Sequence, residues 1–379
     1  MTHHRFVLSA LSILLAAALG PHAVAAQESI KIGVQLPLTG ERAVVGRTIK
    51  QGVEMAVETL NRQGGVNGVP LTVIYEDDQN TKQGAVEAAR RLIQDRRVVA
   101  IIGELFSPFV LASRDLVEQT GVPYLTGGTS PKTTEAAKWV FRVGASDTLL
   151  ADLIAQYAVE HLKMKQLAVL HDRTGIHNAR AELVVRTLQA TYGVVPLVQA
   201  SWKPGEQDFT PQLEQVTAHP VEAIIALGET DEAGPLLRQV KERGIRAPVI
   251  AHRDFGAQRA LEAAGGAAEG VVIMTEYMPM VQEPERQAWA GAYQQRYGSE
   301  ASVIAAQYYD AVLLIAEAIR KGGPDRERIK AGLEQLKGFR GVMANYTFDR
   351  QHNGVHRFHV VKIKGGKPTL ETLLEETVR

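Results

Sequence analysis

The fold is decided at residues 98–131, which read VVAIIGELFSPFVLASRDLVEQTGVPYLTGGTSP. The segment from Val98 to Ile102 is an unbroken run of β-branched and apolar residues, which predicts a strand buried on both faces of a parallel sheet. Ser107-Pro108 then opens a helix, because serine suits the N-cap and proline suits the first helical position. After Gly121, the residues from Val122 to Leu125 predict a second buried strand. The stretch therefore indicates strand, helix and strand of an α/β protein.

Each of these two strands is followed by a polar exit. Ser107-Pro108 follows the first strand, and the glycine-rich segment from Thr126 to Pro131 follows the second. Parallel strands end at the same edge of a sheet, so the hydroxyls and free N–H groups of the two exits predict an anion-sized pocket. A single cap of this kind is more often structural than functional. The pairing of two exits is what favours a binding site.

Strands and helices alternate twice along the chain, which predicts two doubly wound parallel sheets. The first run extends from a strand at residues 30–36 to one at 140–143, and the second begins at Ser146 and ends with a strand at 271–274. Three helices and antiparallel strands follow. We predict an α/β fold of two lobes joined by a multi-strand hinge, with a cleft that closes on a ligand. The predicted lobes are 27–143 plus 278–342, and 144–277 plus 343–379.

The first 26 residues are typical of a secretory signal peptide. Arg5 precedes an apolar run at 6–19, and the small residues at 23–26 permit cleavage after Ala25 or Ala26. The apolar run is too short to span a membrane. The sequence contains no cysteine, so neither a disulfide nor a lipidated cysteine is expected. These features predict a soluble periplasmic protein.

The charge of the chain excludes some classes of partner. The 42 basic and 42 acidic residues balance, and removal of Arg5 with the signal leaves the chain at −1. This balance argues against nucleic acid or an anionic membrane as partner. Roughly 350 residues remain after the signal, more than single hydrophobic cores of ~250–300 residues accommodate, which again predicts two domains.

The sequence lacks the common catalytic and nucleotide-binding motifs. It contains no GxxxxGK[ST], GxGxxG or GxSxG, and His171-Asp172 is the one acid–base candidate at a strand end. Three histidines at 352, 356 and 359 lie in a hydrophilic segment without a usual metal-ligand spacing, so we expect them to be exposed to solvent. We expect the same of the acidic turn at 76–78. The sequence thus favours a binding protein over an enzyme, with no metal and no cofactor.

Many segments resemble, in order, one known family, the type I periplasmic solute-binding proteins of the leucine/isoleucine/valine-binding class. The segments that carry the resemblance are IKIGVQLPLTG at 30–40, NRQGGVNG at 61–68, YEDDQNTKQGAVEAARRLI at 75–93, IIGELFSP at 101–108, GVPYLTGGTSP at 121–131, FRVGASD at 141–147, DFTPQLEQV at 208–216, AAEGVV at 267–272, YYDAVLLIAEAI at 308–319 and TFDRQHNG at 347–354. The resemblance implies the substrate-binding component of an ABC importer, which delivers its ligand to a permease in the inner membrane.

The resemblance also implies how the first lobe binds its ligand. In this family a serine after the third strand, and a threonine and backbone groups after the fourth, bind the ligand's α-carboxylate. Ser107 and Thr129 occupy those positions, and Gly127 or Gly128 would supply the backbone contact. The loop here is one residue shorter than is usual in the family. Phe106 is expected to form an apolar wall beside the carboxylate.

The second lobe departs from the family pattern. Ile176-His177 stands where the family often has Tyr-Gly, and Glu229 stands at a tyrosine position. The acidic residue that usually pairs with an α-amino group falls near Arg253, with Asp254 beside it. These departures concern the ligand and leave the predicted fold unchanged.

Two ligand hypotheses follow. In the first, Glu229 or Asp254 binds an ammonium group, and the ligand is a branched-chain or other aliphatic amino acid. In the second, the ligand is an aromatic or keto acid without an amino group, and it faces one of Arg253, His252, His171 and His177. We predict the first, for a monomeric receptor. The rival classes are a ligand sensor of the same fold and a secreted enzyme that uses His171-Asp172.

Overall fold

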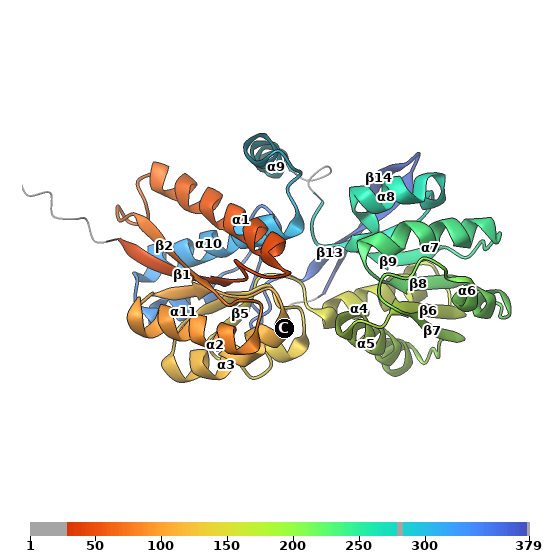
Figure 1. Ribbon diagram of the computed structural model, residues 1–379, viewed down its shortest axis with the longest axis horizontal. Helices are drawn as coiled ribbons and strands as arrows, with labels where there is room; N and C mark the ends of the chain where they lie inside the picture. The colour runs from red at the N-terminus through yellow and green to blue at the C-terminus, as the bar shows by residue number, and fades with distance from the viewer. Residues whose placement is uncertain (1–28, 279–282, 377–379) are drawn as a thin grey trace, which may run out of the picture.

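The computed structural model describes residues 29–278 and 283–376, and the predicted signal peptide at 1–26 lies outside them. The chain forms two lobes side by side, each built on a largely parallel sheet with helices against its faces (Figure 1). This arrangement confirms the prediction of an α/β protein with two doubly wound lobes. The residue numbers at which we divided the lobes stay a prediction.

The first lobe contains a five-stranded parallel sheet in the order β2-β1-β3-β4-β5. Its strands β3 and β4 consist entirely of buried residues, as their apolar sequences predict. The strands are β1 (Ile30–Leu36), β2 (Leu71–Asp77), β3 (Ala100–Ile102), β4 (Tyr124–Thr126) and β5 (Val140–Arg142).

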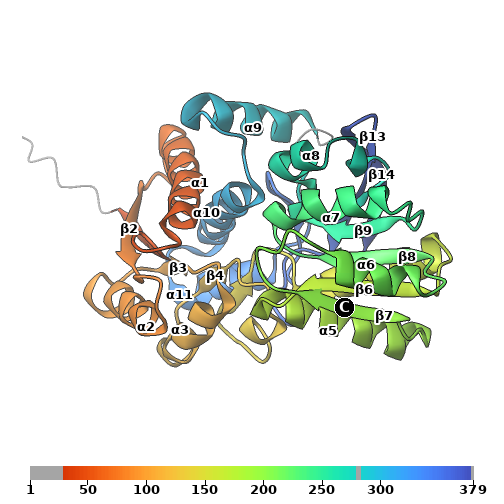
Figure 2. The same cartoon turned by 45° about the vertical axis from the view of Figure 1, so that its right-hand side comes forward.

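Helices from two distant parts of the chain cover the first sheet. They are α1 (Ala43–Arg62), α2 (Lys82–Arg90), α3 (Ser107–Thr120), α9 (Pro284–Tyr297), α10 (Val303–Gly322) and α11 (Arg326–Glu334). Helix α1 packs closely on α10, since a Cβ atom at Gly52 would lie 2.3 Å from the carbonyl oxygen of Ala305. Helix α9 also meets α1, where the Tyr293 hydroxyl donates to Gln51 Oε1 at 2.7 Å. The later helices therefore return to the first lobe (Figure 2).

The second lobe contains a seven-stranded sheet in the order β14-β13-β10-β9-β8-β6-β7. The strands β10, β9, β8, β6 and β7 are parallel, and β13 and β14 add beside β10 in antiparallel fashion. The strands are β6 (Leu167–Asp172), β7 (Val198–Trp202), β8 (Ala223–Leu227), β9 (Val249–His252), β10 (Val272–Thr275), β13 (Arg357–Lys364) and β14 (Lys367–Glu375). The helices are α4 (Asp147–Gln156), α5 (Gly175–Tyr192), α6 (Thr210–Thr217), α7 (Thr230–Glu242) and α8 (Gln258–Ala264).

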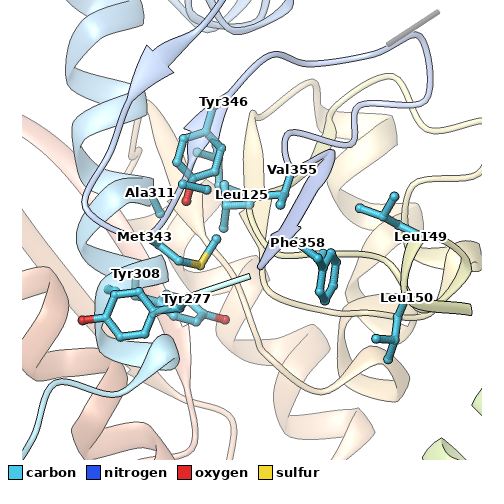
Figure 3. Close-up of a cluster of buried hydrophobic side chains, with 14 of the residues drawn as sticks. Leu125, Leu149, Leu150, Tyr277, Tyr308, Ala311, Met343, Tyr346, Val355 and Phe358 are labelled. Carbon is cyan, nitrogen blue, oxygen red and sulfur yellow. The ribbon is translucent and has the colours of Figure 1, made fainter. Parts of the chain in front are cut away.

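The hinge between the lobes is a buried junction of distant segments. The Arg142 N–H at the end of β5 donates to the carbonyl oxygen of His352 at 2.8 Å, and the His352 ring stacks on Phe141 at a centroid distance of 4.1 Å. Apolar side chains continue the core from one lobe to the other (Figure 3). In that figure Tyr308 and Tyr346 lie on the first-lobe side, and Phe358 lies toward α4. A short hairpin of β11 (Phe339–Arg340) and β12 (Asn345–Tyr346) precedes β13.

Two expectations of solvent exposure are wrong. His352 and His356 are each only 6% exposed, because they pack into the hinge and contact backbone carbonyl groups there. Asp78, in the turn after β2, is fully buried beneath the loop that follows β3. None of the helices in the described ranges is long and apolar enough to cross a membrane.

Candidate functional site

In the first lobe, Ser107 and Thr129 lie at the two polar exits that the sequence predicted. Helix α3 begins at Ser107 itself, so the predicted capping role of this serine is wrong. Its hydroxyl oxygen instead accepts a hydrogen bond from the Ser130 N–H at 3.1 Å, which joins the two exits. The Thr129 hydroxyl donates to Asp147 Oδ2 at 3.0 Å. Both side chains are half-buried.

The amide groups of the loop differ in what they have left to offer a ligand. The Gly128 N–H donates to Thr126 Oγ1 at 3.0 Å, and the Gly127 N–H donates to the Tyr308 hydroxyl oxygen. By contrast, no hydrogen bond among the described residues uses the Thr129 N–H. The loop thus places its unpaired amide at Thr129, one residue beyond the two glycines.

A buried arginine at the end of β5 fixes this loop from behind. Arg142 donates to the carbonyl oxygens of Gly128 at 2.6 Å and Ser130 at 2.9 Å, and to Asn353 Oδ1 at 2.9 Å. Burial lowers the pKa of Arg142 to about 10, so the guanidinium remains charged at neutral pH. Because the loop carbonyl groups bind Arg142, the opposite edge of the loop faces the cleft.

Phe106 is not a free apolar wall, since the guanidinium of Arg42 lies 4.1 Å from the centre of its ring. Arg42 also donates to Asn80 Oδ1 at 3.1 Å. This stack places a cation beside the start of α3, where an anion would gain from both the helix N-terminus and the positive charge. Arg42 was not among the predicted site residues, although its place in the loop after the first strand is a signal that the sequence contains.

A narrow cavity lies at the hinge between Thr129 and the second lobe. Asp147, at the start of α4, accepts from the Thr129 hydroxyl and from Arg180 Nε, the latter at 2.7 Å. It therefore links the two lobes at the floor of the cavity. The cavity is lined by Thr129, Ala145, Ser146, Asp147, Leu150, Arg180, His252, Arg253, Met274, Glu276 and Phe358.

In the second lobe, the ends of β6, β8 and β9 place five titratable side chains together, which we call the histidine cluster: Asp172, His177, Glu229, His252 and Asp254. His177 Nδ1 donates to Asp172 Oδ2 at 2.8 Å. Burial alone would raise the pKa of Asp172, but hydrogen bonds from His177 and Thr174 outweigh it and lower that pKa. The same opposition holds at Asp254, where His252 and Arg253 lower the pKa against the effect of burial.

Three comparisons with known proteins agree on one family. The family pattern described as "Periplasmic binding protein" matches residues 29–367. The chain belongs to the periplasmic binding protein family. This finding confirms the resemblance seen in the sequence.

Several relatives of this periplasmic binding protein are amino-acid-binding proteins by name or were solved with an amino acid bound. The Leucine-, isoleucine-, valine-, threonine-, and alanine-binding protein of Pseudomonas aeruginosa is 30% identical over 86% of this chain and 87% of its own length. A leucine binding protein from Thermotoga maritima is 27% identical, with a TM-score of 0.74, over 91% of this chain and 99% of that one. An ABC transporter substrate-binding protein from Desulfitobacterium hafniense, solved in complex with Leu, is 25% identical, also with a TM-score of 0.74, over 91% and 100%.

The structure brings together some of the sequence-predicted site residues of this family member and separates others. Glu229, Arg253 and Asp254 lie at the cleft end of the second sheet. His171 lies elsewhere, because it lines a cavity between α5 and the strands β6 and β7. Ile176 is 41% exposed and takes no part in the histidine cluster.

Two predicted partnerships change in the structure. Asp172 pairs with His177, not with the side chain of His171, whose Nδ1 contacts the Asp172 carbonyl oxygen. Arg253 forms an ion pair with the buried Glu276, and its side chain remains 27% exposed. Glu276 follows a strand end directly, and that signal could have identified it from the sequence.

Proposed function

We propose that this protein is the solute receptor of an ABC importer and binds an aliphatic amino acid between its lobes. The observation that carries the proposal is the set of unpaired donors at the two polar exits of the first lobe, opposite a second lobe that presents carboxylates. The names of the relatives support the same ligand class.

In this proposal the ligand's carboxylate binds at Ser107 and Thr129. The Ser107 hydroxyl oxygen accepts from Ser130, which leaves its own hydrogen free to donate. The Thr129 N–H and the N-terminus of α3 supply further donors, and Arg42 adds positive charge nearby. A carboxylate would gain charge-assisted hydrogen bonds from all of them.

The second lobe then binds the ammonium group. The side chain of Asp254 is 32% exposed and that of Glu229 is 55% exposed, so both carboxylates can reach a ligand. The Arg253 guanidinium is already neutralised by Glu276. The available carboxylates and the already paired Arg253 favour an amino acid as ligand. An aromatic or keto acid would need an unpaired cation in the same lobe.

The partners and compartment belong to the same proposal. As a monomeric receptor in the periplasm, the protein would deliver its ligand to an inner-membrane permease, a role that the names of its ABC transporter relatives support. Its cleft residues bind and orient a ligand, and the proposal assigns them no catalytic step.

A thermal-shift screen of amino acids, aromatic acids and keto acids tests the proposal. A ligand that binds only the folded protein raises its melting temperature, so we expect a shift with aliphatic amino acids. Ser107→Ala removes one charge-assisted hydrogen bond and should weaken binding by about 1.5–3 kcal/mol, roughly tenfold or more. The matched control is Thr120→Ala at the other end of α3, where the hydroxyl bonds only to helix carbonyl groups. A shift with keto acids alone would contradict the amino-acid proposal, and equal affinity in both variants would contradict the role of Ser107.

A further inference from the structure

The histidine cluster has a geometry that binding of an amino acid does not require. One nitrogen of His177, one nitrogen of His252 and one carboxylate oxygen of Asp254 all lie within 4.8 Å of one another. The two imidazoles are 1% and 2% exposed, whereas the carboxylate side chain is 32% exposed. The three groups therefore form a pocket with buried nitrogen ligands and one partly open side.

The first imidazole holds an unpaired nitrogen. Asp172 accepts the Nδ1 proton of His177 at 2.8 Å, so the lone pair of this ring lies on Nε2. His177 Nε2 is buried and has no hydrogen-bond partner among the described residues. A buried polar atom left unpaired costs about 1–3 kcal/mol, so a missing partner is indicated. A carboxylate that orients a histidine in this way is the usual outer shell of a metal ligand.

The second imidazole faces an oxygen at each of its nitrogens. His252 Nε2 lies 3.0 Å from the carbonyl oxygen of Gly228, and Nδ1 lies 3.2 Å from Asp254 Oδ2. A neutral imidazole carries only one N–H. When Nε2–H donates to Gly228, the Nδ1 lone pair faces a carboxylate, and a cation between them would convert this repulsion into attraction.

The surrounding charges also favour a cation. Five carboxylates lie in the histidine cluster or beside it, and only two guanidinium groups accompany them. Each of the two arginines already pairs with one of these carboxylates. The acids are Asp147, Asp172, Glu229, Asp254 and Glu276, and the bases are Arg180 and Arg253. Three negative charges thus remain for a bound divalent ion to offset.

We propose that His177 Nε2, His252 Nδ1 and Asp254 bind a divalent transition-metal ion such as Zn²⁺. Two imidazoles and one carboxylate form the protein ligand set of an open zinc site, which leaves a further position for water or solute. Asp172 and the Gly228 carbonyl group act as positioning partners of the two rings. This site goes beyond the proposed function. It shares Asp254 with the proposed ammonium site, but its test with Zn²⁺ alone does not depend on amino-acid binding.

Titration calorimetry of the chelator-treated full chain with Zn²⁺ alone tests the site, with Co²⁺ absorption as a second readout of ligand geometry. We expect one equivalent to bind in the unmodified protein through these residues. His177→Gln and His252→Gln should each weaken its binding at least 100-fold, and Asp172→Asn about 10- to 100-fold. His219→Gln is the matched control, since that histidine is exposed and contacts only the Gln215 carbonyl oxygen.

Circular dichroism of the metal-free variants verifies that they are folded. If either buried-histidine variant does not fold, Asp254→Asn replaces it, because that side chain is partly exposed; we expect at least a tenfold loss. Zn²⁺ binding that persists unchanged in Asp254→Asn and the folded histidine variants would arise from other histidines and overturn the proposal. The absence of Zn²⁺ binding to the unmodified protein would also overturn the proposal. This holds even if the same variants lose affinity for amino acids, because that loss would support only the proposed function.

Discussion

Among single side chains, Asp78 and Glu104 form a buried acidic pair near the start of α3, where Glu104 Oε2 accepts from the Phe106 N–H. Asp78 Oδ2 and Glu104 Oε1 are both buried without a hydrogen-bond donor among the described residues. Burial raises the pKa of both, to about 6 for Asp78 and well above the ordinary value for Glu104. The charge of Asp78 adds to the rise at Glu104, whereas the hydrogen bond with Glu104 partly offsets the rise at Asp78. At acidic pH the pair therefore retains a proton that the two carboxyl groups share.

This pair makes stability depend on pH. Because both pKa values are higher in the folded than in the unfolded chain, the folded state binds more protons above about pH 4, and the free energy of unfolding falls as pH rises. We expect the pair to contribute a loss on the order of 2 kcal/mol between pH 5 and pH 8. Urea unfolding at both values should show a smaller loss in Glu104→Gln, which cannot ionise. The exposed Glu242→Gln is the control, and an equal slope in Glu104→Gln would refute the assignment.

Candidate site residues could be proposed from the sequence only where chain position points to them. Ser107 and Thr129 were proposed because each lies in the polar segment that follows a buried strand. The link between His177 and His252 was not, since it depends on β6, β8 and β9 lying side by side in the folded sheet. Asp78 was predicted to be solvated because acidic turns usually are, but its tertiary contact with Glu104 overrides that tendency.

At the level of helices, the contact between α1 and α10 holds a late segment of the chain on the first lobe. Gly52 permits this contact, since an added Cβ would lie 2.3 Å from the Ala305 carbonyl oxygen, which is backbone and cannot rotate away. We expect Gly52→Ala to lower the free energy of unfolding by about 1–3 kcal/mol through overpacking.

The control for that prediction lies in α9, where a Cβ at Gly291 would meet no atom within 4 Å. Gly291→Ala should raise the free energy of unfolding by about 0.5–1 kcal/mol, because alanine has the higher helix propensity. Urea denaturation measures both changes. If Gly52→Ala were as stable as Gly291→Ala, the helices would not be packed as described.

Elements were predictable where local sequence dominates, and less so at sheet edges. The apolar residues at 194–200 predict a strand over that range, but the structure places β7 at Val198–Trp202. Pro196 cannot donate to a ladder, and Val195 is 64% exposed. Strand β14 was not predicted, since its residues are mostly polar and it forms only by pairing with β13.

For the whole molecule, the hinge explains how two sheets act as one receptor. Asp147 binds Thr129 of the first lobe and Arg180 of the second, and Arg142 fixes both the loop at 128–130 and the segment at Asn353. A ligand that contacts either lobe therefore also affects the residues that join the lobes. Such coupling suits closure about a hinge. The alternation of strands and helices predicted this architecture, but it could not predict which side chains of the second lobe face the first.

The central claim is that the cleft recognises an amino acid through its carboxylate. The most direct test is titration calorimetry of the protein with L-leucine and, in parallel, with L-leucinamide, which keeps the ammonium group and side chain but lacks the carboxylate. We predict binding of one equivalent of leucine and a loss of at least 100-fold in affinity for the amide, because Ser107, Thr129 and the α3 N-terminus would face a group without negative charge. Equal affinity for the two compounds, or no binding of leucine or any other aliphatic amino acid, would contradict the account.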